Sequence, residues 1–120
     1  MQTIWSTACV GIGPKTEELA QMGMVVTFGT NAPDEIAEFC VSITVQPVSE
    51  PIVPGNYLQI GDQAFPVTAV GDVAQENLGN LGHVTFNFDG ATEPSMPGTI
   101  HVEGAVPAIE VGTELSLIAA

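Results

Sequence analysis

The segment GHVTFNFD, residues 82–89, has the clearest periodicity in the chain and indicates its fold class. Val84, Phe86 and Phe88 alternate with polar residues, and side chains two positions apart lie on the same face of a strand. The segment therefore predicts a β-strand with an apolar face toward a core and a polar face that carries His83.

The same alternation recurs nearer the C-terminus. Ile100 and Val102 form an apolar face there, and His101 and Glu103 fall on the opposite, polar face. His83 and His101 are the only two histidines of the chain. Because both are expected on polar strand faces, an imidazole nitrogen of each should be reachable from solvent.

Elsewhere in the sequence, further short runs are rich in β-branched residues. Many of the 13 glycines and nine prolines separate these runs. Their pattern predicts strands at residues 4–10, 24–28, 41–45, 57–60, 63–70 and 113–118. Short helices are expected over residues 15–22, 31–40 and 73–81. We therefore expect a mainly β fold, a barrel or sandwich with short helical insertions, in which residues 1–120 form one domain.

The charge balance is strongly acidic, with 14 Asp and Glu residues against one basic residue, Lys15, and a net charge of −13. Binding of nucleic acid depends on cations that replace the counterions of the phosphates, so nucleic acid is an unsuitable partner. The same excess repels anionic lipid surfaces and favours basic protein partners.

Neither a membrane span nor a disulfide framework is expected. The apolar runs are interrupted well short of the roughly 20 residues that a spanning helix requires. Cys9 and Cys40 can form at most one bridge, and no signal segment opens the chain, so we expect a cytoplasmic protein with no direct membrane insertion. Both cysteines are interpreted as core residues.

Common catalytic motifs are missing from the sequence. The turn GIGPKT, residues 11–16, lacks the spacing of a phosphate-binding loop, and no Gly-x-Ser-x-Gly elbow occurs. His83 and His101 could form a metal site with Asp89 and Glu103, but their spacing matches no ligand motif. We therefore expect neither a metal nor a cofactor.

Three blocks of sequence carry a family resemblance: FPVTAVG at residues 65–71, NLGNLGHVTF at residues 77–86 and PGTIHV at residues 97–102. In these blocks, and in the aromatic-Cys pair Phe39-Cys40, the chain resembles the IIA component of the glucitol/sorbitol-specific phosphotransferase system (PTS). The resemblance implies a closed β-barrel of complex topology. It also implies a cytoplasmic phosphocarrier that takes a phosphoryl group from the histidine-containing phosphocarrier protein and passes it to a IIB/IIC component during sugar uptake.

The phosphorylated histidine of that family lies shortly after the aromatic-Cys pair, at a position that corresponds to Ile43 here. An isoleucine has no lone pair, so the family reaction cannot run through this position. If the chain carries phosphate, His83 or His101 is the expected acceptor. The alternative is a non-catalytic interaction or regulatory module with the same fold.

Overall fold

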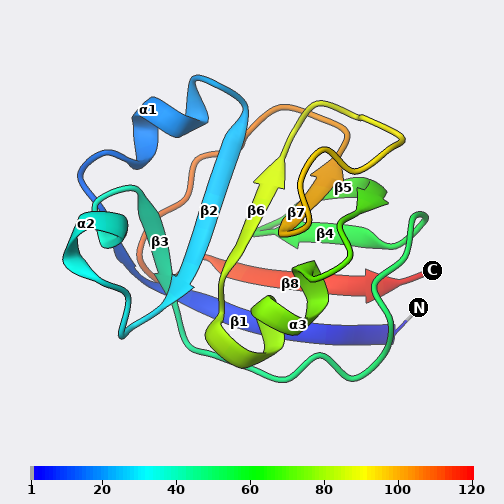
Figure 1. Ribbon diagram of the computed structural model, residues 1–120, viewed down its shortest axis with the longest axis horizontal. Helices are drawn as coiled ribbons and strands as arrows, with labels where there is room; N and C mark the ends of the chain where they lie inside the picture. The colour runs from blue at the N-terminus through cyan, green and yellow to red at the C-terminus, as the bar shows by residue number, and fades with distance from the viewer. Residues whose placement is uncertain (1) are drawn as a thin grey trace.

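The computed structural model describes residues 2–120 and consists of eight strands and three short helices, shown in Figure 1. The strands are β1 (Gln2–Ile12), β2 (Met24–Gly29), β3 (Cys40–Ile43), β4 (Tyr57–Ile60), β5 (Gln63–Val70), β6 (Val84–Asn87), β7 (Thr99–Val102) and β8 (Glu114–Ala119). The helices are α1 (Thr16–Ala20), α2 (Asp34–Ala37) and α3 (Ala74–Leu81).

The strands close into one barrel in the order β1-β3-β2-β6-β7-β5-β4-β8. Most neighbours are antiparallel, but β2 pairs with β3 and β6 pairs with β7 in parallel. A parallel pair needs a connection that returns to the starting end of the sheet, and α2 and the segment 88–98 provide these two connections. The prediction of a mainly β fold with a closed barrel of complex topology is confirmed.

The barrel encloses the core. The alternation in the segment 82–89 is confirmed, because Val84 and Phe86 are buried while His83 and Thr85 are only partly buried. The largest fully buried side chains come from nearly every strand and from α3, and they are Ile4, Trp5, Ile43, Leu58, Ile60, Leu78, Val84, Phe86, Ile100, His101, Leu115 and Leu117.

Several element boundaries differ from the sequence-based expectation. The strand expected to reach Val45 ends at Ile43, after which the chain leaves the barrel as the irregular segment 44–56. The first two helices are also shorter than expected, and neither has a side-chain cap hydrogen bond at its start. Within residues 2–120, no helix has the length and apolar character needed to cross a bilayer.

Glycine at position 71 is required by a close approach of two backbone segments. A Cβ built on Gly71 falls 2.3 Å from the Pro97 carbonyl oxygen and 2.4 Å from that of Met96. We expect Gly71→Ala to lower the free energy of unfolding by about 1–3 kcal/mol, measured by chemical denaturation, because these carbonyls must move.

Gly79 provides the matched control. It lies inside α3 at an ordinary helical φ, and its nearest contacts, in Val48, are 3.9 Å from a built Cβ. We expect Gly79→Ala to raise the free energy of unfolding by about 0.5–1 kcal/mol because alanine favours the helix. Equal effects at the two positions would contradict the steric explanation.

Candidate functional site

His83 lies where α3 gives way to β6. The helix ends at Gly82, whose φ of 69° is left-handed and allows the chain to turn directly into the strand. Thr27 of β2 pairs with Val84, so His83 stands beside the end of β2. Its ring stacks on Phe28, with 4.5 Å between the ring centroids and 30° between the ring planes.

One ring nitrogen of His83 is fixed and the other is free. The Nδ1 atom lies 3.0 Å from the carbonyl oxygen of Thr27. A carbonyl oxygen can only accept, so Nδ1 carries a hydrogen, and in the neutral ring Nε2 keeps its lone pair. Within residues 2–120, this is the only hydrogen bond of the ring, which remains partly exposed. When the ring is neutral, this arrangement leaves Nε2 as the available nucleophilic nitrogen.

Ile43 lies at the same end of the barrel as His83. Gly29 pairs with Ile43 in the parallel β2–β3 ladder. Gly29 also packs against Gly82, because a Cβ built on Gly82 falls 3.1 Å from the Gly29 backbone nitrogen. Gly29 therefore connects the two positions, although they are far apart in sequence. The Ile43 side chain is fully buried in the core and exposes nothing at this site.

His101 is placed quite differently, and the expectation that its nitrogen is reachable is wrong. The ring is 0% exposed. Its Nδ1 atom lies 2.8 Å from Oδ1 of Asp89, and its Nε2 accepts a hydrogen bond of 3.1 Å from the backbone N–H of Ser95. The cause is the parallel β6–β7 pair, because its connection, segment 88–98, runs back over the outer face of β7 and covers this ring.

The hydrogen bonds of His101 leave it without a free lone pair. Since the Ser95 N–H donates to Nε2, the hydrogen of the neutral ring is on Nδ1 and is donated to the Asp89 carboxylate. The hydroxyl of Ser95 also lies 3.2 Å from Nε2, so the three side chains follow the order of a hydrolase triad. The Nε2 lone pair nevertheless accepts from the Ser95 N–H. The contacts of His101 with Asp89 and Ser95 therefore hold segment 88–98 on the barrel.

Comparison with known proteins supports a family assignment for this barrel. A family model described as "PTS system glucitol/sorbitol-specific IIA component" matches residues 4–116. The chain belongs to this IIA family. Its sequence is 39% identical over 107 residues to the "PTS system glucitol/sorbitol-specific EIIA component" of Shigella flexneri and to that of Escherichia coli (strain K12). Each match covers 89% of this chain and 87% of the relative.

A solved structure shows the same fold. It is described as the crystal structure of a PTS system IIA component from Enterococcus faecalis V583 and superimposes with a TM-score of 0.84. The match covers 96% of this chain and 100% of the other, at 23% sequence identity. At that identity the likeness shows the fold alone, which agrees with the closed barrel of this IIA family member.

The two histidines lie far apart in this IIA family member. Asn87 of β6 pairs with His101 of β7. His83 precedes Asn87 by four residues, which corresponds to about 13 Å along an extended chain. Residues 2–120 contain no group of three His, Cys, Asp or Glu side chains that could hold a metal ion. The structure therefore separates the two histidines that could have shared a metal with Asp89 and Glu103.

The cysteines are buried in the barrel, as expected for core residues. Neither is in a disulfide, and burial raises the pKa of both the Cys9 and the Cys40 thiol. A raised pKa lowers the fraction of thiolate, which is the nucleophilic form. Lys15 supplies no charge to them, because its Nζ pairs with Glu38 at 3.6 Å.

Two parts of the His83 site could not be found from the sequence. The Thr27 carbonyl orients the ring and Phe28 stacks on it, but both belong to a strand whose pairing with β6 has no local signal in the sequence. The segment 24–28 was recognisable as a strand, and only the closed barrel shows which strand it adjoins.

The Asp89–His101 contact predicts a pH effect on stability. Burial alone would raise the pKa of Asp89, but hydrogen bonds from the Ala91 N–H and from His101 outweigh it and lower the pKa below its ordinary value of 3.8. The ionised carboxylate thus stabilises the fold above pH 3.8, and this contribution is lost as the pH falls through the lower folded-state pKa.

We expect Asp89→Asn to lower Tm by a few degrees at pH 7, and the difference from the wild type to vanish in strong acid. Thermal unfolding followed by circular dichroism over pH 2–7 measures this. Glu50→Gln, an exposed glutamate on segment 44–56, controls for the loss of one negative charge. A Tm difference that is constant over the whole pH range would contradict the proposed contact.

Proposed function

We propose that this IIA family member is a cytoplasmic phosphocarrier that holds a phosphoryl group on Nε2 of His83. It takes the group from the histidine-containing phosphocarrier protein and passes it to a IIB component during sugar uptake. The observation that carries the proposal is the hydrogen bond from His83 Nδ1 to the Thr27 carbonyl, which leaves the Nε2 lone pair available.

The transfer step balances without an added base. The lone pair of His83 Nε2 forms a bond to the phosphorus of the donor's phosphohistidine, and the donor N–P bond breaks in line with it. The electron pair of that bond returns to the donor ring, which leaves as a neutral imidazole when its other nitrogen is protonated. His83 keeps its Nδ1 hydrogen, and the Thr27 carbonyl oxygen stabilises the positive charge that develops on the phosphorylated ring.

The phosphoryl charge must be met largely by the partner. Lys15 is the only Lys or Arg of the chain, and it is paired with Glu38 rather than placed at His83. Lysine and arginine side chains of a docked protein can supply the missing cations. The net charge of −13 favours the approach of such a basic partner and increases its association rate at low salt.

Incubation with phosphoenolpyruvate and the general phosphotransferase proteins tests the proposal. We expect one acid-labile phosphoryl group per chain, with a ³¹P spectrum typical of phosphate on the Nε2 nitrogen of histidine. An ordinary sorbitol IIA protein is the positive control. No incorporation under conditions that phosphorylate the control would contradict the proposal.

A second candidate function is a non-catalytic interaction or regulatory module, and burial of Ile43 favours it. By the resemblance, Ile43 corresponds to the phosphorylated histidine of the family, and its side chain is fully buried and carries no nucleophile. Such a module should form a salt-sensitive complex with the histidine-containing phosphocarrier protein and accept no phosphate. Titration calorimetry combined with the phosphorylation assay distinguishes the two functions, because only the carrier becomes phosphorylated.

A further inference from the structure

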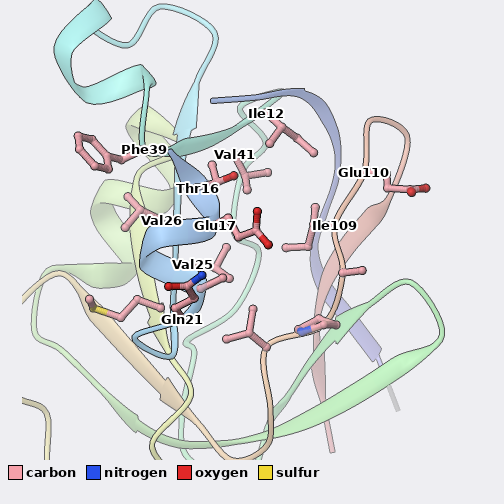
Figure 2. Close-up of a pocket in the computed structure, with 15 residues that line it drawn as sticks. Ile12, Thr16, Glu17, Gln21, Val25, Val26, Phe39, Val41, Ile109 and Glu110 are labelled. Carbon is pink, nitrogen blue, oxygen red and sulfur yellow. The ribbon is translucent and has the colours of Figure 1, made fainter. Parts of the chain in front are cut away.

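A groove of about 510 Å³ opens at the end of the barrel where β2 and β3 begin. Figure 2 shows it between α1 on one side and the segment with Ile109 and Glu110 on the other. Val25 and Val41 belong to its lining and are buried residues of the core. The barrel itself therefore forms the base of the groove.

The lining of the groove is mainly apolar, and its charged groups are acidic. Ile12, Phe39 and Ile109 contribute apolar surface, whereas Glu17 and Glu110 are exposed carboxylates. Lys15 lies with its Nζ 5.4 Å from the centre of the Phe39 ring, but its charge is paired with Glu38. The groove therefore combines an apolar interior with a net negative rim.

Exposed apolar surface continues beyond the groove. Ile12 is 40% exposed, and its neighbour along β1, Val10, is 48% exposed. Val111 is 67% exposed and precedes Gly112, whose N–H donates to the Cys9 carbonyl oxygen over 2.8 Å, so Val111 lies near this end of β1. A small molecule in the groove would leave these side chains in water, whereas a protein surface would cover them.

The carboxylates at the rim of the groove indicate which side chains such a partner protein carries at the contact. Carboxylates at the rim repel phosphates, anionic lipids and acidic peptides. They attract lysine or arginine, while the interior accepts an apolar side chain. The complementary surface is thus an apolar side chain flanked by basic residues.

The groove and His83 lie at opposite ends of β2. Met24, Val25 and Val26 line the groove, whereas Thr27 and Phe28 contact His83. Figure 1 shows the same separation, with α1 near the start of β2 and α3 near its end. The distance from Met24 to Phe28 is about 13 Å at the rise of an extended strand. A side chain inserted in the groove therefore does not contact His83.

We propose that the groove is a docking site for a protein partner that inserts an apolar side chain between basic residues. Resting on the proposed function, this partner is the phosphoryl-accepting IIB component, which stays anchored in the groove while the donor protein exchanges at His83. In this proposal the protein exchanges phosphate with two partners at one histidine. If the IIB component stays bound in the groove, its contact with His83 becomes intramolecular, which raises its effective concentration there.

Titration calorimetry with the purified, unphosphorylated IIB component tests the docking site. We expect Ile12→Glu to weaken binding at least about tenfold, because it places a charge in the apolar contact. Val53→Glu is the matched control, since Val53 is 46% exposed, lies outside the groove and should leave the affinity unchanged. The double variant Glu17→Lys, Glu110→Lys should also weaken binding and reduce its salt dependence, whereas Glu50→Lys should have a much smaller effect.

The donor reaction provides the second readout. Phosphorylation by the phosphorylated donor protein should proceed at the wild-type rate in Ile12→Glu. The docking proposal is wrong if the IIB component does not bind, if Ile12→Glu and Val53→Glu bind equally, or if Ile12→Glu slows the donor reaction as much as it weakens IIB binding. Binding of the IIB component is measured without phosphate. If His83 accepts no phosphate, the proposed function is wrong, but the binding measurement still tests the docking site.

Discussion

Replacement of His83 by asparagine is expected to abolish phosphoryl transfer, with a loss of at least about 100-fold in the rate of phosphate incorporation. The asparagine amide N–H can still donate to the Thr27 carbonyl oxygen, as Nδ1 does, so the local structure is kept. What is lost is the lone pair of Nε2. The rate of labelling from phosphoenolpyruvate, at a fixed concentration of the donor protein, measures the effect.

Thr85→Ala is the control for this variant. Thr85 lies two residues further along β6, is partly buried like His83 and points to the same face, so its replacement should leave the labelling rate near that of the wild type. Phe28→Leu should lower the rate while leaving transfer possible, because the ring loses the stacking partner that orients it. Acid-labile phosphate that persists in His83→Asn would show that another residue is the acceptor.

The features of the fold that depend on local sequence were predictable. Alternation in the segment 82–89 indicated β6 and its buried face because the period of a strand is set by its backbone. The same reasoning failed for His101, although the alternation in β7 is equally clear. Strand parity tells which side of the sheet a residue occupies, and it contains no information on whether another segment covers that side.

The His83 site depends on pairings between distant parts of the chain. Its ring contacts β2, and Gly29 brings it to the same barrel end as Ile43 through the parallel ladder with β3. Non-local pairings of this kind have no sequence signature, so the individual strands were predictable and their neighbours were not. The groove is also non-local, because α1, β2 and the segment before β8 form it together.

His83 and Ile43 lie at one end of the barrel but on opposite faces of its wall, because side chains of neighbouring strand residues alternate. Gly29 pairs with the fully buried Ile43, whereas its neighbour Phe28 stacks on the partly exposed ring of His83. In the proposed function, a donor docked at this end therefore reaches the ring of His83 and not the side chain at position 43. The fully buried His101 offers no such alternative, because segment 88–98 lies between it and any partner.

Replacement of His101 by alanine is expected to have the largest effect on stability, a loss of about 3–4 kcal/mol in the free energy of unfolding. The variant leaves a cavity beneath segment 88–98. It also deprives the Ser95 N–H of its acceptor. Chemical denaturation measures the loss, and hydrogen exchange of the Ser95 amide should become much faster as the segment detaches.

Two further variants separate the hydrogen bonds of His101 from its packing. His101→Leu keeps the buried volume and removes the Nε2 acceptor, so it should cost about 1–3 kcal/mol and still accelerate exchange of the Ser95 amide. Ser95→Ala keeps the backbone bond and removes only the hydroxyl of an exposed residue, so it should cost less than about 1 kcal/mol. If His101→Leu were as stable as the wild type and protected the Ser95 amide equally, the hydrogen bonds would not anchor the segment. Packing of the ring would then be the only reason that β7 holds a buried histidine.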